Sequence, residues 1–176
     1  PETKGLWYRY DLCALAECGL TKEFVPQEAI QRALVELRDS FECGCADFFL
    51  LRALVMLGCA GEPEVIRALE RSIPLPDGGF LCGHRIAKLK YVPKSCYKAN
   101  LHALLLAAEM KKRNLECPFA ENLVQYFWNH NVFYKTADLN APVLDARPGW
   151  RTVDTFFPAE TMRVGLQHLV HALCAL

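Results

Sequence analysis

Apolar residues recur along this chain at the spacing of an amphipathic helix, and four of the apolar stretches share one short pattern. In each of them an apolar residue is followed by a variable residue, Ala and Leu. Apolar side chains three and four positions apart lie on one face of an α-helix, so each stretch predicts a helix. We call these four the first-type helices. They contain Leu12–Leu15, Leu51–Leu54, Leu101–Leu104 and Val170–Leu173.

A second type of helix is predicted after each of the first two stretches. Gly19 and Gly58 follow the shared pattern by four residues and indicate helix ends, because glycine adopts the left-handed conformation without a steric penalty. Pro26 and Pro63 come next and indicate helix starts, since proline is favoured in the first helical turn. The apolar faces of these second-type helices comprise Ile30, Leu34 and Leu37 in one copy and Val65, Ile66 and Leu69 in the next.

The ends of the second-type helices are also alike in sequence. We expect one helix to end at Phe41–Gly44 and the other at Phe80–Gly83. Both stretches read Phe-x-Cys-Gly, which supports a repeat of one structural unit. The remaining predicted segments are a first-type helix at Tyr97–Arg113, a second-type helix at Pro118–Asn129, a loop at Phe133–Pro158 and a first-type helix from about Ala159 to Leu176.

These segments together predict an all-α fold, an array of antiparallel helix pairs in one domain over residues 1–176. Of the 176 residues 52% are apolar, and the formal net charge is zero. Balanced charge argues against nucleic-acid binding, and no apolar run is long enough for a membrane span. The nine cysteines lie mostly in apolar helical patterns, which is typical of the reducing cytoplasm. The chain has no initiator Met and stops within an apolar helix, so we expect it to be part of a longer protein.

The centre of the chain resembles a known repeat. Gly78-Gly79-Phe80 is followed by a glycine-containing basic loop, then by Tyr97 and by Ala103-Leu104. This succession is similar to the turn between units in the α/α-toroid superfamily, which includes protein prenyltransferase β subunits and squalene and terpene cyclases. The glycines permit a sharp turn with positive φ, and Phe80 would fill the apolar layer between pairs. The resemblance implies an α/α-toroid-like partial ring of about three and a half helix pairs.

The catalytic motifs of that superfamily are mostly missing. The chain has no Asp-x-Asp-Asp, the acid motif of cyclases. Lys94-Ser95-Cys96 stands where prenyltransferases carry the Asp-x-Cys zinc ligands, and an ammonium group repels a metal ion. We therefore assign no catalytic residue and leave enzyme status open.

Two groups of residues could nevertheless bind a ligand. Arg85, Lys88, Lys90 and Lys94 lie in a stretch without acidic residues, from position 78 to 108, and could hold an anion. The resemblance implies an isoprenoid diphosphate as that anion; a solvated basic loop is the alternative. Aromatic residues could line an apolar cavity, or they could belong to the ordinary core. The aromatic candidates are Tyr97, Phe127 and Phe157.

A metal site is a further candidate. The similar helix ends contribute Cys43, Cys45, Cys82 and His84, which make up the Cys₃His set of many structural zinc sites. The repeat alone also explains why Cys43 and Cys82 match, so buried or rim cysteines without a metal are the alternative. We therefore predict no required cofactor, and zinc is the one that the sequence would allow.

Three functions remain open at this point. The first is a prenyltransferase-like or cyclase-like domain that binds an apolar, isoprenoid-type small molecule. The second is a non-catalytic helical scaffold that contacts a protein partner or forms a homo-oligomer, since stacked helix pairs offer long surfaces. The third is a zinc-stabilised structural module.

Overall fold

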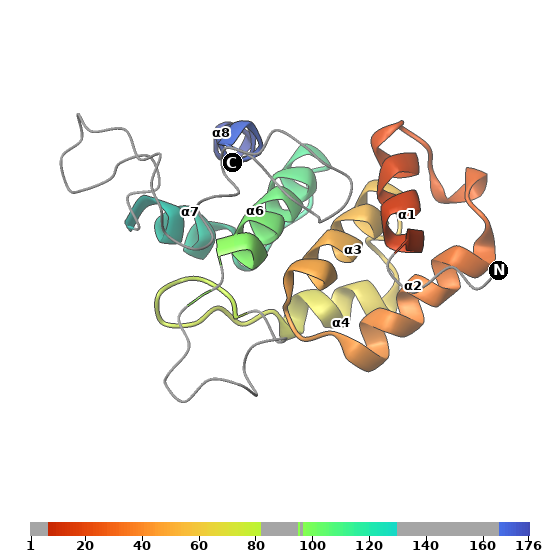
Figure 1. The fold of residues 1–176 in the computed structure, drawn as a ribbon, viewed down its shortest axis with the longest axis horizontal. Coiled ribbons are helices and arrows are strands. Elements are labelled where there is room, and N and C mark those ends of the chain that lie inside the picture. The colour runs from red at the N-terminus through yellow and green to blue at the C-terminus, as the bar shows by residue number, and fades with distance from the viewer. Residues whose placement is uncertain (1–6, 82–94, 96, 130–165) are drawn as a thin grey trace.

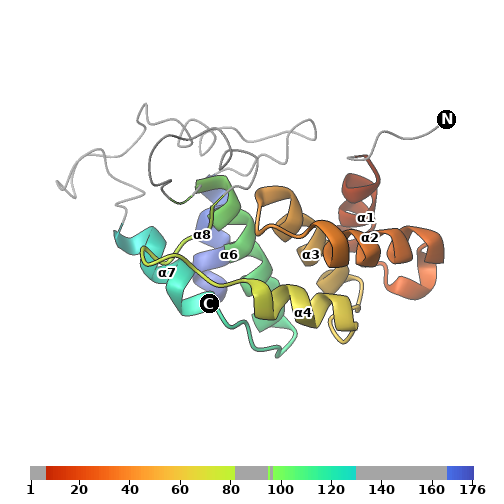
Figure 2. The same ribbon diagram turned by 90° about the horizontal axis from the view of Figure 1, so that it is seen from below.

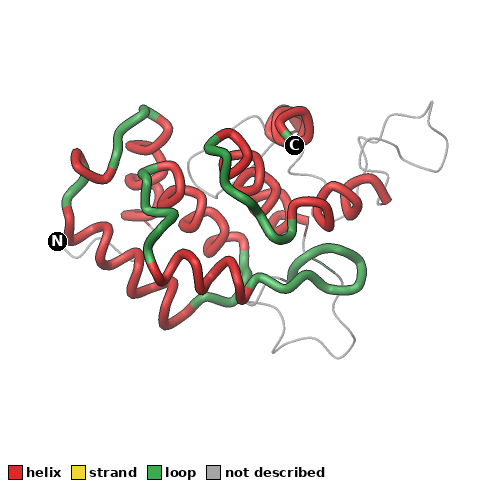
Figure 3. The backbone as a smooth tube through the Cα atoms, turned by 180° about the vertical axis from the view of Figure 1, so that it is seen from behind, coloured by secondary structure: helices red, strands yellow, loops and turns green. Residues whose placement is uncertain are grey.

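A computed structural model describes residues 7–81, 95, 97–129 and 166–176 of the chain. Every regular element in these ranges is helical, which confirms the all-α prediction for this part of the chain (Figure 3). None of the described helices has both the length and the apolarity that crossing a membrane requires. The elements are α1 (Trp7–Glu17), a 3₁₀ turn (Lys22–Phe24), α2 (Gln27–Ser40), α3 (Cys45–Met56), α4 (Pro63–Arg71), α6 (Tyr97–Lys112), α7 (Ala120–Asn129) and α8 (Leu166–Ala175).

The first-type helices pack side by side in chain order. Helix α3 lies between α1 and α6, and α6 lies between α3 and α8, so that α1, α3, α6 and α8 form what we call the first row (Figures 1 and 2). Helices α2 and α4 pack against each other and against their partners α1 and α3, and α7 packs on α6. The predicted helix pairs are therefore present, and the chain alternates between the first row and the helices beside it.

Three first-row helices end in the same backbone motif. Gly19 and Gly58 adopt positive φ values of 81° and 87°, as predicted, and Asn114 adopts 55°. After α1, the N–H of Leu20 donates to the carbonyl of Leu15 at 3.1 Å, which closes a Schellman turn. The equivalent bonds follow α3 and α6. Asparagine takes the glycine position after α6 because it tolerates the left-handed region better than most residues.

The core joins the repeats through phenylalanine side chains. Phe48 of α3 is surrounded by Phe41, Phe80 and Phe119, with ring centroids 6.0, 4.7 and 5.8 Å away. Phe80 also meets Phe119 edge-on at 5.2 Å. All four side chains are buried. Phe41 and Phe80 therefore play the same structural part at the ends of successive units, as the repeat predicted.

Two expectations about α4 were wrong. The helix ends at Arg71, well before Phe80. Pro74 explains the early end, because the residue before a proline is disfavoured in the helical region and proline itself removes a helical hydrogen bond. Ile66, expected on the buried face, is exposed, whereas Val65 and Ala68 are buried. Of the fourth first-type helix the structure describes α8, and residues 130–165, including the predicted loop, lie outside the described ranges.

Candidate functional site

The turn that carries the resemblance is fastened to the start of α6. Asp77 accepts hydrogen bonds from the N–H of Gly79 at 3.1 Å and from the hydroxyl of Ser95 at 2.5 and 2.6 Å. The amide oxygen of Asn100 accepts the N–H of Phe80 at 2.6 Å. Asn100 is fully buried, so this bond holds the backbone beside Phe80 in the core. The turn thereby fixes where Phe80 enters the aromatic cluster.

The two glycines of this turn are needed for different reasons. Gly78 has a φ of 85°, and a Cβ there would lie 2.6 Å from the backbone oxygen of Asn122 on α7. Gly79 does not have a positive φ, but a Cβ there would lie 2.5 Å from the amide nitrogen of Asn100 and from the hydroxyl of Ser95. Only Gly78 uses the positive φ that we expected glycine to permit, and Gly79 permits close packing. The motif has a structural role.

Most predicted ligand-binding residues lie outside the described part of the chain. Those outside are Arg85, Lys88, Lys90, Lys94 and Phe157. Tyr97 is the first residue of α6. Phe127 lies on α7 and is buried in the hydrophobic core of the protein. Its ring and that of Tyr126 meet edge-on, with their centroids 5.2 Å apart. The one candidate whose side chain is described is therefore a core residue.

The predicted zinc ligands are described in part. Cys43 has a φ of 57°, and its Sγ lies 3.8 Å from the carbonyl oxygen of Arg71 and 4.0 Å from the hydroxyl of Ser72. Burial raises the pKa of the Cys43 thiol above its usual value. Cys45 begins α3, and Cys82 and His84 lie outside the described ranges. Among the residues that the structure describes, no three metal-ligating side chains come together, and the zinc site stays a prediction.

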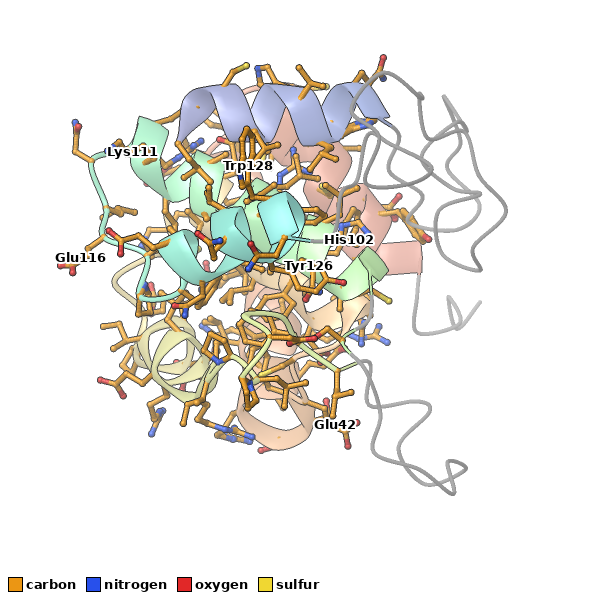
Figure 4. The ribbon with its side chains drawn as sticks, turned by 90° about the vertical axis from the view of Figure 1, so that its left-hand side faces the viewer. Glu42, His102, Lys111, Glu116, Tyr126 and Trp128 are labelled. Atoms are coloured by element: carbon orange, nitrogen blue, oxygen red, sulfur yellow. The ribbon has the colours of Figure 1, made fainter. Side chains whose placement is uncertain are left out.

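A depression of about 290 Å³ lies near the start of α3. Asp47 lines it and accepts the N–H groups of Glu42 and Gly44 at 3.0 and 2.9 Å, which caps the helix. Arg9 also lines it and is paired with Glu36 of α2; burial lowers the pKa of Arg9. Glu42 lies at the edge of the molecule (Figure 4). Arg9 and Asp47 both make contacts within the fold, so these two lining residues have a structural role.

His102 is a buried titratable side chain of the first row. It lies in the interior of α6, and its ring meets that of Phe49 on α3 edge-on at 5.6 Å. Lys111 and Glu116, by contrast, lie at the surface near the end of the same helix (Figure 4). His102 occupies the variable position of the shared pattern, next to Leu101. Its contacts join two first-row helices.

The shared pattern allows the first-row helices to be compared position by position. Its first residue is Leu12, Leu51, Leu101 or Val170, and the first three are 1%, 0% and 0% exposed. Val170 of α8 is 44% exposed. Four residues later, one turn along the helix, Cys174 is likewise exposed, whereas its equivalents are buried. These equivalents are Ala16, Val55 and Leu105.

We call the surface formed by Val170 and Cys174 the forward face of α8. Among the described helices, α8 packs on α6 through its other side, where Leu169 and Ala172 are fully buried. The stretch from Leu166 to Leu176 contains no Asp, Glu, Lys or Arg. The forward face is thus an exposed apolar strip on an uncharged helix, at a position that a neighbouring helix covers elsewhere in the row.

Sequence reasoning did not single out this face. The repeat was recognised, but Val170 was treated as equivalent to Leu51 and Leu101. One signal was available: the stretch is uncharged. Other exposed apolar side chains are scattered over different elements, as is normal for a folded protein. They are Phe24, Val35, Ile66, Ile73, Leu115 and Trp128, of which Trp128 is visible in Figure 4.

Comparison with known proteins adds no relative from which a function could be carried over. No protein-family description, no curated protein and no solved structure matches this chain.

Proposed function

We propose that this chain is a scaffold of paired helices that binds another protein, and that the forward face of α8 is its binding surface. The observation that supports this is the exposure of Val170, at the position where Leu51 and Leu101 are completely covered. In stacked helix units, neighbouring helices cover each other's apolar faces. The exposed, apolar and uncharged face of α8 therefore favours a further contact.

The gain from covering this face is modest for each residue. Burying a valine side chain completely is worth about 1.5–3 kcal/mol, so covering the 44% of Val170 that remains exposed contributes roughly 1 kcal/mol. A stable complex therefore requires that the partner cover the whole length of α8, as α3 and α6 cover each other. A helix with small or apolar residues along one face is the partner that fits.

Three polar groups that line the turn before α6 or the depression at α3 are engaged by the fold. Asp77 holds the turn before α6, Asp47 caps α3, and Arg9 is paired with Glu36. A general acid or base must be able to reach a substrate, and these groups are occupied by the fold. A scaffold needs no such group.

Site-specific photo-crosslinking tests the proposal. A photoreactive amino acid replaces Val170 in one variant and Val35 of α2 in the control, since the two valines are 44% and 43% exposed. We expect a discrete protein adduct from position 170 and none from position 35, and the unlabelled chain should compete the adduct away. The variant Val170→Asp should compete poorly. Equal labelling from both positions would contradict the proposal.

A second candidate function rests on the arrangement of the helix pairs. In the α/α-toroid superfamily such pairs stand side by side around a ring, and first-type helices side by side in chain order are what that arrangement requires. In this reading the chain is a prenyltransferase-like or cyclase-like partial ring of about three and a half pairs. It would bind an apolar, isoprenoid-type diphosphate, with Arg85, Lys88, Lys90 and Lys94 near the diphosphate.

Binding of a fluorescent farnesyl diphosphate analogue tests this second candidate. The double variant Lys90→Glu, Lys94→Glu should lose binding, because the reversed charge repels the diphosphate. The control Lys111→Glu, on the exposed end of α6, should bind as the unmodified chain does. If the unmodified chain takes up no analogue, this candidate is excluded.

A further inference from the structure

The opposite end of the first row presents a second uncovered face. Asp11, Ala14 and Cys18 are all exposed on α1. In the shared pattern Asp11 is equivalent to Leu50 of α3, and Ala14 is equivalent to Ala53. The equivalents of Asp11 and Ala14 in all three later first-row helices are at most 1% exposed. They are Leu50, Asn100 and Leu169, and Ala53, Ala103 and Ala172.

We call this surface the backward face of α1. On α8, which contacts α6, Leu169 and Ala172 are buried, and on α1, which contacts α3, the forward residues Leu12 and Ala16 are buried. This burial is the pattern expected if each interior contact of the row joins the forward face of one helix to the backward face of the next. The contact occurs between α1 and α3, between α3 and α6, and between α6 and α8.

In the described part of the chain, the forward face of α8 and the backward face of α1 are thus both exposed. From this we propose that the partner of the forward face is a second copy of this chain, whose α1 docks on α8 head to tail. The inference rests on the proposed function and names its partner. The new contact would continue the first row from one copy into the next, with Val170 in the place of Leu51 on α3 and Ala14 in the place of Ala103 on α6.

The side chains of the backward face suit this contact. Ala14 and Cys18 are small, as are their equivalents Ala103 and Ala107 in α6, so a neighbouring helix can approach closely. Asp11 stands where α6 has Asn100, which is buried and accepts a hydrogen bond through its side-chain oxygen. The row therefore accommodates a polar side chain at this position where that side chain has a hydrogen-bond partner.

A two-fold contact between two α8 helices is the competing arrangement. It would bury Val170 and Cys174 of one copy against the same two residues of the other, and it would leave α1 exposed. It repeats no helix contact found in the described part of the chain. A head-to-tail contact uses two different surfaces, so it either closes into a ring or continues as a filament. Helix α1 takes part in the head-to-tail contact and not in the two-fold contact. Variants on α1 therefore distinguish the two arrangements.

The test compares variants at the two ends by light scattering and sedimentation over a wide concentration range. Val170→Asp alters the forward face, and Ala14→Arg alters the backward face. Matched controls on α2 are Val35→Asp, at an equally exposed valine, and Gln31→Arg, at an exposed helical position. We expect the unmodified chain and both controls to self-associate, and each end variant to dissociate at least about ten-fold more readily. Circular dichroism shows that every variant remains helical.

A mixing experiment separates the arrangements. Ala14→Arg keeps an intact forward face, and Val170→Asp keeps an intact backward face. Each should be monomeric alone, and their mixture should form a one-to-one dimer that grows no further. If Ala14→Arg self-associates as the unmodified chain does, while Val170→Asp does not, the contact is two-fold and the head-to-tail inference is overturned.

Failure of this inference can be told apart from failure of the proposed function. A folded chain that stays monomeric at all concentrations overturns the inference. If position 170 still crosslinks to a different protein, the scaffold function stands with another partner. If the chain stays monomeric and position 170 labels no protein, both proposals are refuted.

Discussion

Glycine-to-alanine substitutions separate the two structural demands that this fold places on glycine. Four glycines differ in just these demands. Gly61 has no positive φ, and a Cβ added there would meet no atom within 4 Å; Gly58 has a φ of 87° but open space around it. Gly79 has no positive φ, but a Cβ added there would lie 2.5 Å from side-chain atoms of Asn100 and Ser95. Gly78 has both a φ of 85° and a backbone oxygen 2.6 Å from the added Cβ.

The expected losses of unfolding free energy follow from these four environments. Alanine at Gly61 should change stability by less than about 0.5 kcal/mol, because it meets neither strain nor contact. At Gly58 the left-handed conformation costs about 1–2 kcal/mol. At Gly79 the methyl group displaces Asn100 and threatens its bond to Phe80, which costs about 1–3 kcal/mol. Gly78→Ala combines strain with a backbone clash and should lose about 2–5 kcal/mol.

Urea unfolding followed by circular dichroism measures these losses as shifts of the midpoint at constant slope. The expected order of stability is Gly61→Ala, then Gly58→Ala and Gly79→Ala, and last Gly78→Ala. The reasoning is refuted if Gly78→Ala loses no more than Gly58→Ala, since the contact with Asn122 would then not constrain the turn. It is equally refuted if Gly79→Ala behaves as Gly61→Ala does.

Three further predictions concern single side chains. Phe80→Ala should lower the free energy of unfolding by about 3–5 kcal/mol, whereas Phe24→Ala, on the surface, should change it by less than about 0.5 kcal/mol; thermal unfolding compares them. Burial raises the pKa of Cys13 to about 12, so iodoacetamide should label Cys13 far more slowly than the exposed Cys18, as peptide mass spectrometry of the folded chain would show. Burial works to raise the pKa of Glu109, but hydrogen bonds from Lys112, the last residue of α6, and from the next residue, Arg113, lower it. A carboxyl with a lowered folded-state pKa stabilises above its unfolded pKa, so Glu109→Gln should lose about 0.5–1 kcal/mol at neutral pH, and in urea titrations the difference should shrink as the pH falls below the unfolded pKa of about 4.3 and through the lowered folded-state pKa.

The fold was predictable where the local sequence decides the structure. Helix periodicity and the glycines at positions 19 and 58 sufficed for α1 and α3, because the Schellman turn depends on a single residue that accepts positive φ. The end of α4 was not predicted, since Phe41 and Phe80 suggested equal helix lengths. Their likeness reflects a shared contact with Phe48, and the prolines at positions 74 and 76 determine where the helix stops.

The candidate site could not be predicted in the same way, because exposure depends on neighbours and not on residue type. Leu51 and Val170 are equivalent apolar residues in equivalent helices, yet one is fully covered and the other is 44% exposed. The difference arises from the place of each helix in the row: α3 has a neighbour on either side, and among the described helices α8 has one. Periodicity identifies a helical face, but only the tertiary arrangement shows whether that face is filled.

The same arrangement links association to folding. In a stack of helix units, stability is approximately the sum of the contributions of the units and of the contacts between neighbours. Among the described helices, α1 and α8 each have one neighbour in the first row, whereas α3 and α6 each have two. A head-to-tail contact would supply the missing term at both ends at once. Because a partner that binds only the folded state stabilises it by mass action, the ends of the row would then be ordered most firmly in the assembled protein.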